Sequence, residues 1–148
     1  MKVIIAIRKF KPKIIFAPYF NDRHPDHIDA SHLIKRAMFS TGLSKIKSFD
    51  KEVPQNHYRP EKLFYYMQTY TFDPAFIVDI SDTFDLKMKA VECYGTQFHN
   101  PKSKEPETFI SSPEFLTYIK SRAEFYGFAI GKKFGEPFFC EEIIELDM

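Results

Sequence analysis

A short apolar run that leads into a histidine-containing loop and then into an amphipathic helix constrains this fold most. Residues 13–17 are almost continuously apolar, which is typical of a strand that helices bury on both faces. Beyond a loop at 18–25, apolar residues recur at the spacing of one helix face, at Ala30, Leu33, Ile34, Ala37 and Met38. A buried strand followed by such a helix predicts an α/β fold with a parallel sheet.

The rest of the chain predicts further elements of both kinds. Helices are expected at residues 1–10, after a cap at Asp82, and after a capping box from Ser111 to Glu114. Strands are expected at 63–70, 75–80 and 138–146, and an irregular connection at 44–62. An α/β domain normally opens with a strand, so the helix at 1–10 suggests entry part-way through a βαβ series.

Length and composition favour one globular domain over residues 1–148. The net charge of +1 gives no general electrostatic reason to expect nucleic acid or an anionic membrane as partner. Two cysteines are too few for a disulfide framework, which favours a reducing cytoplasm. No apolar stretch approaches the roughly 18 residues of a membrane span. We therefore expect a cytoplasmic protein, with neither nucleic acid nor a membrane as its partner.

The loop carries the strongest chemical signal, in the sequence NDRHPDH at residues 21–27. In open α/β sheets, sites form outside the carboxyl ends of strands, and this loop leaves such an end. Imidazoles are good zinc ligands, and a carboxylate can orient a ligating histidine through its other ring nitrogen. On residue chemistry, His27 fits a ligand and Asp26 an orienting carboxylate. Equally, His24 can cap the helix, with Pro25 as its first residue and Asp26 favouring its N-terminus.

The sequence around this loop resembles a known family. FAPYFNDRHPDH followed by a helix is similar to the second signature of the LmbE/PIG-L N-acetylglucosaminyl deacetylases. Further on, FDPAFIVDIS, the Thr96-Gln97-Phe98 segment, the stretch 100–108 and Arg122-Ala123 also look like that family, and especially like the deacetylases of bacillithiol biosynthesis. The resemblance implies a Rossmann-like, three-layer LmbE-type fold. It also implies zinc-dependent hydrolysis of the N-acetyl group of an N-acetylglucosamine conjugate, with N-acetylglucosaminyl malate as the expected substrate.

The resemblance also implies roles for individual residues. His27 matches the zinc ligand, and His24 the imidazole that stabilises the oxyanion or protonates the leaving amine. Asp26 matches the carboxylate that holds an imidazole in place. Arg23 would bind the malate carboxylate, because a guanidinium pairs with a carboxylate in bidentate fashion. Its alternative is a surface cation beside Asp22.

One part of the family pattern is missing. The family takes its other zinc ligands and its general base from a His-x-Asp-Asp motif, and this sequence has no Asp-Asp pair and no histidine before His24. We therefore expect the C-terminal part of a deacetylase, truncated at its N-terminus, with an incomplete Zn²⁺ site and no activity on its own. Its expected partner is an N-terminal fragment in trans or a second copy. The alternative is a non-catalytic remnant or sugar-binding subunit.

Overall fold

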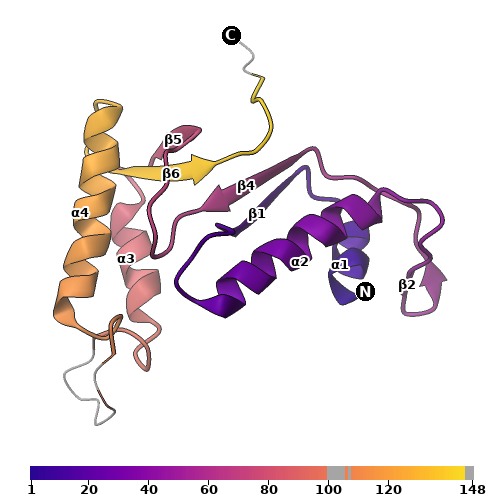
Figure 1. Ribbon diagram of the computed structural model, residues 1–148, viewed down its shortest axis with the longest axis horizontal. Helices are drawn as coiled ribbons and strands as arrows, with labels where there is room; N and C mark the ends of the chain where they lie inside the picture. Colours follow the sequence, from indigo (N-terminus) through magenta and orange to yellow (C-terminus); the bar gives the residue numbers. More distant parts are fainter. Residues whose placement is uncertain (100–105, 107, 146–148) are drawn as a thin grey trace. The chain divides into compact units, whose positions relative to one another are not determined.

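The structure is a computed structural model that describes residues 1–99, 106 and 108–145 (Figure 1). Most of the stretch 100–108, which entered the family resemblance, lies outside the described residues. The chain forms two compact units, one of Met1–Ala75 with Phe138–Met148 and the other of Phe76–Pro137. Each unit is described by itself below.

The first unit is built on two parallel strands. β1 (Ile14–Pro18) pairs in parallel with β4 (Lys62–Tyr66), from Ile14 opposite Lys62 to Pro18 opposite Tyr66. β4 also pairs with the end of β6 (Gly135–Phe139), and this pairing is antiparallel. The sheet is therefore mixed: the expected parallel pairing is confirmed for β1 and β4, and the antiparallel pairing with β6 differs from the expectation. Hydrophobic patterning does not report the direction of a strand, which explains why the antiparallel partner was not expected.

Two helices accompany these strands in the first unit. α1 (Lys2–Phe10) packs against α2 (Pro25–Thr41), and α2 packs against β1 (Figure 1). Their core consists of Ile4, Ile7 and Ala37, with Val3, Ile15, Ile46 and Tyr58 packed around it. The helices expected at 1–10 and after the histidine loop are confirmed. A small hairpin of β2 (Phe49–Asp50) and β3 (Val53–Pro54) lies within the connection that was expected to be irregular.

Two expectations about burial in this unit are wrong. Ile14 and Phe16 of β1 are 45% and 51% exposed, so this strand is not covered on both faces. Leu33 of α2 is 55% exposed, whereas the small residues Ser31 and Thr41 are buried. Small side chains let a helix approach its neighbours closely, and the side of α2 with Ser31 and Thr41 therefore faces inward more than the apolar spacing indicated.

The C-terminal end of α2 is closed by a buried arginine. Arg8 is 3% exposed, and its guanidinium donates to the carbonyl oxygens of Thr41, Leu43 and Ile46 at 2.7 to 3.2 Å. It also donates to Ser48 Oγ at 2.8 Å. Thr41 carries the last carbonyl of α2, and Leu43 and Ile46 belong to the turn that follows the helix. Arg8 therefore joins the C-terminal end of α2 to that turn.

The second unit has its own core. It contains β5 (Phe76–Asp79), α3 (Phe84–Glu92), α4 (Pro113–Ala129) and the first residues of β6, which lie next to β5. The core consists of Phe84, Ala123 and Phe134, and the rings of Phe84 and Phe134 stack at 3.8 Å. A Cβ atom on Gly127 would lie 2.7 Å from the backbone of Phe134, so α4 approaches the chain before β6 more closely than any side chain allows.

The ends of several elements differ from the sequence-based expectations. α3 is capped by Thr83 and not by Asp82, and α4 by Ser112 and not by Ser111, neither with a side-chain capping bond. β4 ends at Tyr66 instead of continuing to residue 70, and the last strand begins at Gly135 instead of 138. The strand expected at 75–80 is confirmed as β5. Capping signals recur at neighbouring positions, so the pattern locates a helix better than its first residue.

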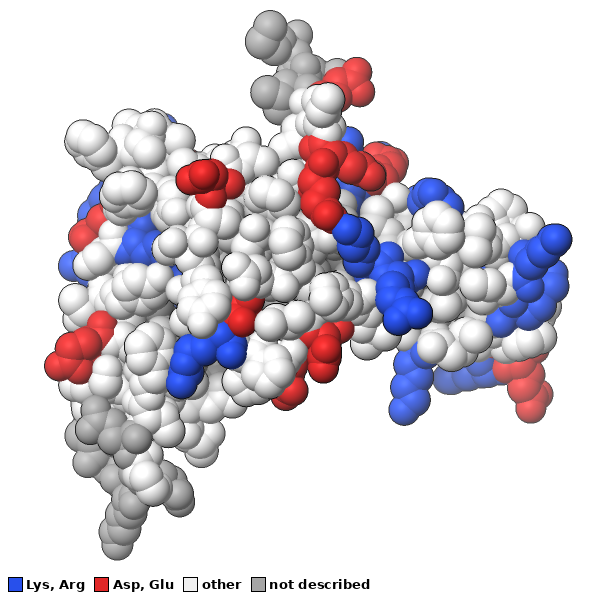
Figure 2. Space-filling view, viewed as in Figure 1, with Lys and Arg blue, Asp and Glu red and all other residues white. Residues whose placement is uncertain are grey.

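The surface gives two further observations. On the face shown in Figure 2, lysine and arginine side chains are interspersed with aspartate and glutamate, and the described residues form no continuous basic surface there. Among the described helices, none combines the length and the apolar character required to cross a membrane.

Candidate functional site

The histidine loop is positioned by the carboxyl ends of the two parallel strands. Residues 19–24 connect β1 to α2, and the backbone N–H of Tyr19 donates to the carbonyl of Tyr66 at 3.2 Å. Parallel strands end at the same edge of a sheet, so the loop after β1 lies beside the chain that leaves β4. A cluster of aromatic rings supports this edge, with centroids 4.4 to 6.4 Å apart, formed by Tyr19, Phe20, Tyr65, Phe72 and Phe139.

Asp22 is the buried centre of the loop, with a side chain that is 1% exposed. Its Oδ1 accepts from the His24 backbone N–H at 3.1 Å and lies 2.9 Å from His27 Nδ1, and its Oδ2 accepts from the Thr69 N–H at 3.0 Å. Burial raises the pKa of Asp22, but the hydrogen bonds from Thr69, His24 and His27 outweigh it and hold the pKa below its ordinary value. Asp22 is therefore a carboxylate at neutral pH.

His27 lies between two polar partners. An ionised carboxylate only accepts hydrogen bonds, so the Asp22 contact places a proton on His27 Nδ1. On the other side of the ring, His27 Nε2 lies 3.3 Å from Gln68 Nε2. This arrangement fixes the orientation of the imidazole and leaves the Nε2 lone pair for an acceptor or ligand role.

His24 begins α2. It is the N-cap residue, and its Nδ1 accepts from the Asp26 backbone N–H at 3.2 Å. Pro25 is the first helical residue, and Asp26 is the acidic residue of the first turn. The capping interpretation is therefore confirmed. It is compatible with a chemical role, because the His24 side chain is 55% exposed and its ring centroid lies 5.0 Å from that of His27.

The carboxylate beside His27 is not the one that residue chemistry suggested. Asp26 is 86% exposed, and its Oδ2 lies 4.0 Å from His24 Nδ1. The carboxylate that contacts His27 is Asp22, because the loop turns back over the strand ends before α2 begins. Arg23, between Asp22 and His24 in the sequence, is exposed. The structure thus brings His24 and His27 together and keeps the Asp26 side chain in solvent.

Gln68 and Asp22 are the residues that sequence reasoning left without a role beside His27. Asp22 stood in the quoted motif, and burial alone distinguishes it from Asp26. Gln68 is the first polar side chain after the aromatic run of β4. A polar residue just past the carboxyl end of a buried strand could have indicated Gln68 as a site residue. That inference requires that the strand be parallel to the one that leads into the histidine loop.

The described side chains supply one zinc ligand of the expected kind, His27. His27 has the carboxylate-backed imidazole that zinc ligands typically show. Among the described residues, however, no group of three or more His, Cys, Asp or Glu side chains could hold a metal ion. A catalytic zinc takes three protein ligands, so the described residues do not make such a site.

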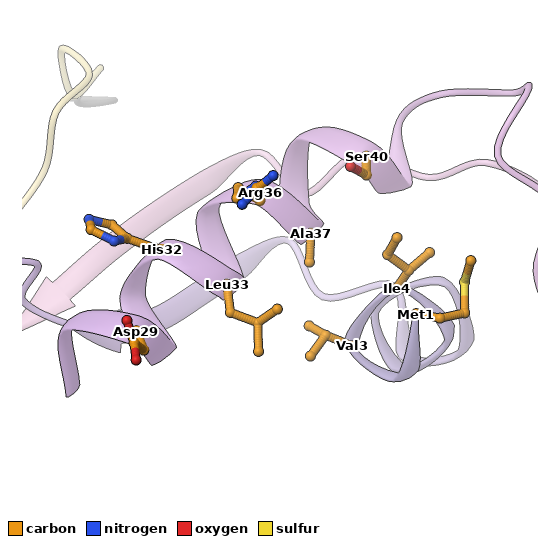
Figure 3. A pocket seen from close by; sticks show the side chains of 9 residues that line it. All are labelled: Met1, Val3, Ile4, Asp29, His32, Leu33, Arg36, Ala37 and Ser40. Carbon is orange, nitrogen blue, oxygen red and sulfur yellow. The ribbon is translucent and has the colours of Figure 1, made fainter. Parts of the chain in front are cut away.

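A cavity of about 400 Å³ opens elsewhere in the first unit, between α1 and α2 (Figure 3). Its floor is apolar, from Val3, Ile4 and Ala37, and Asp29 and Arg36 of α2 lie among its polar lining residues. Neither His24 nor His27 lines it. The cavity is therefore separate from the histidine loop.

Comparisons with known proteins point to deacetylases. No family model matches the chain. It is 29% identical over 140 residues to the diacetylchitobiose deacetylase of Thermococcus kodakarensis, across 91% of this chain and 47% of that protein. The chain therefore spans about half the length of the curated relative that it matches.

Solved structures agree with this relationship. The conserved protein TT1542 from Thermus thermophilus matches with a TM-score of 0.80 and 30% identity, over 98% of this chain and 59% of that chain. The N,N'-diacetylchitobiose deacetylase from Pyrococcus horikoshii, complexed with its inhibitor MPG, matches with a TM-score of 0.73 and 28% identity, over 93% and 48%. The chain is thus homologous to diacetylchitobiose deacetylase and has the mixed α/β fold of these structures.

A third structure shows the fold alone. The 4-carboxy-2-hydroxymuconate hydratase GalB from Pseudomonas putida matches with a TM-score of 0.72 over 99% of this chain and 59% of that chain, at 14% identity. A fold shared with a hydratase cannot by itself assign an activity, so the functional argument has to rest on the histidine loop and on the deacetylase homologues.

Proposed function

We propose that this chain carries one half of the active site of a zinc-dependent deacetylase that acts on an N-acetylglucosamine conjugate. The observation that carries the proposal is the buried Asp22 carboxylate behind His27, at the carboxyl ends of β1 and β4. Homology to diacetylchitobiose deacetylase supports the class of substrate. The resemblance to bacillithiol-pathway deacetylases favours N-acetylglucosaminyl malate within that class.

In this proposal, His27 Nε2 is the metal ligand that the chain contributes, and the other ligands come from beyond the described residues. His24 lies beside it, with an exposed imidazole that can meet a substrate oxygen or amine close to His27. Arg23 is exposed in the same loop and would pair with a carboxylate on the conjugate. Asp26 would hold the His24 imidazole in place. His24 Nδ1 accepts from the Asp26 backbone N–H and lies 4.0 Å from Asp26 Oδ2.

The proposal is tested by acetate release from N-acetylglucosaminyl malate and from N,N'-diacetylchitobiose in the presence of zinc. The chain is assayed alone and together with the N-terminal segment of a homologous deacetylase. We expect turnover only with that segment, because the described residues lack the remaining ligands. Robust turnover by the chain alone would contradict the half-site proposal.

Single substitutions in the complemented protein separate the proposed roles. His27→Ala should lose both metal and turnover, whereas His24→Ala should keep the metal and lose mainly turnover. Arg23→Ala should lower kcat/KM for the malate conjugate more than for diacetylchitobiose. Saturable sugar binding without turnover in every combination would instead favour the alternative, a non-catalytic sugar-binding subunit.

A further inference from the structure

Gln68 contacts the one nitrogen of His27 that Asp22 leaves available. It lies two residues beyond the end of β4, is half-buried, and places its amide Nε2 3.3 Å from Nε2 of His27. The two residues are 41 positions apart in the chain, so the fold and not local sequence creates this contact.

The direction of this hydrogen bond follows from the contact on the other side of the ring. Asp22 Oδ1 takes the proton on Nδ1 at 2.9 Å, so Nε2 of the neutral imidazole carries a lone pair. A side-chain amide nitrogen can only donate. Gln68 therefore donates to His27, and both ring nitrogens are held.

The neighbouring residue strengthens this arrangement. The backbone N–H of Thr69 donates to Asp22 Oδ2 at 3.0 Å, so consecutive residues hold the imidazole and the carboxylate behind it. The Tyr19–Tyr66 backbone bond fixes the loop against the end of β4, just before this pair. Gln68 is thus placed by backbone hydrogen bonds on both sides of it in the sequence, at Tyr66 and at Thr69.

From these contacts, we propose that Gln68 is a positioning residue that caps Nε2 of His27, so that any ligand of this nitrogen must displace the Gln68 amide. The capping itself goes beyond the proposed function and does not depend on it. Its consequence for zinc, which would compete with Gln68 for the same lone pair, rests on the proposed function.

The capping is tested by the rate at which diethyl pyrocarbonate modifies each histidine, followed by peptide mass spectrometry. This reagent acylates an imidazole nitrogen whose lone pair is free. Gln68→Met removes the donor at nearly the same side-chain length and should accelerate modification of His27 about fivefold, the factor that one ordinary hydrogen bond supplies. The exposed residues His32 and His57 serve as references within the chain, and Gln97→Met, at an exposed glutamine of the second unit, as the matched control.

Each result decides the proposal. An unchanged His27 rate in a folded Gln68→Met variant would overturn it, and so would equal acceleration of all histidines, which would indicate general loosening. If Gln68→Met does not fold, Gln68→Asn takes its place, because its shorter amide cannot reach Nε2 and the same acceleration is expected. In two-bond ¹H–¹⁵N spectra, the Nε2 resonance of His27 should move while the proton stays on Nδ1.

The zinc consequence has a separate measurement. In the protein complemented with the N-terminal segment of a homologous deacetylase, zinc should protect His27 from diethyl pyrocarbonate at a lower concentration when the chain carries Gln68→Met than when it is unaltered. Protection at equal concentrations would show that Gln68 does not compete with the metal. Absence of zinc protection in both complemented proteins, with the acceleration still observed, would remove the zinc part of the proposed function and leave the capping intact.

Discussion

The two ends of α2 solve the same physical problem in different ways. Both ends of a helix leave backbone groups without partners inside the helix. At the C-terminal end, the buried Arg8 donates to the carbonyl of Thr41 and to those of Leu43 and Ile46 in the turn that follows, all within the protein. At the N-terminal end, His24 makes a single capping bond, and more than half of its side chain is in contact with solvent.

This difference separates an end with a structural role from the end that carries the proposed site; they are called the structural end and the chemical end below. All three guanidinium nitrogens of Arg8 donate hydrogen bonds to protein oxygens, so the guanidinium has little capacity left for a ligand. In the loop, Asp22 is equally buried, but it holds a half-buried imidazole whose second nitrogen faces a displaceable amide. A buried charge therefore stabilises the fold at one end and orients the His27 imidazole at the other.

The largest effect is expected at the structural end. Arg8→Met should lower the free energy of unfolding by about 3 kcal/mol, because it removes every hydrogen bond of the buried guanidinium and leaves the Ile46 carbonyl and Ser48 Oγ without this donor. The carbonyls of Thr41 and Leu43 keep backbone donors, from Tyr58 and Ile46. Urea unfolding followed by circular dichroism measures this loss. Arg8→Lys keeps the charge but not the planar guanidinium. Its free energy of unfolding should lie between those of the unaltered chain and Arg8→Met. A loss below about 1 kcal/mol would mean that water replaces the arginine.

A smaller loss is expected for the buried aspartate at the chemical end. Asp22→Asn should cost about 2 kcal/mol, because the amide cannot accept the hydrogen bonds of His27 and Thr69 as a carboxylate does. The same substitution should remove part of the acid sensitivity of the chain. Since its folded-state pKa lies below 3.8, Asp22 contributes stability above about that pH, and this is lost as the pH falls through the lower folded value.

Comparison of urea midpoints at pH 7 and pH 3 for the two proteins measures this effect. The gap between the unaltered chain and Asp22→Asn should narrow at the lower pH. A gap that stays constant would show that the charge of Asp22 does not contribute to its stabilising role.

The helix cap itself should contribute less. His24→Ala removes the acceptor of the Asp26 N–H and should cost about 0.5 to 1 kcal/mol, in the range of other N-cap losses. His24→Asn restores a side-chain acceptor and should recover most of this stability without restoring an imidazole. If His24→Asn recovers stability in urea unfolding but not turnover in the complemented protein, the two roles of His24 are separated.

The smallest effect is expected for Asp26, the exposed counterpart of Asp22. Asp26→Asn should lower the free energy of unfolding by about 0.3 kcal/mol, because an exposed negative charge at a helix N-terminus stabilises the helix by about this amount. This effect should vanish at high salt. A loss as large as that of Asp22→Asn would remove the distinction between the two carboxylates.

Much of the fold was accessible from sequence patterns. The periodicity of α1 and α2, the apolar run of β1, and the proline after His24 located these elements within a few residues. The sheet direction was not accessible, because the antiparallel pairing of β4 with β6 joins segments more than seventy residues apart. The exposure of Leu33 and Phe16 also depends on which neighbours are present, and an apolar pattern does not report neighbours.

The sequence by itself determined the loop, its helix and the two histidines, because motif spacing and capping are local properties of the chain. Only the tertiary structure decided which carboxylate holds His27 and which side chain faces its other nitrogen. Asp22 and Asp26 are the same residue type four positions apart, and their roles differ because one is covered by the chain leaving β4 and the other is not. Gln68 reaches His27 because β1 and β4 are parallel and end at the same edge, a relation between distant segments that arises only on folding.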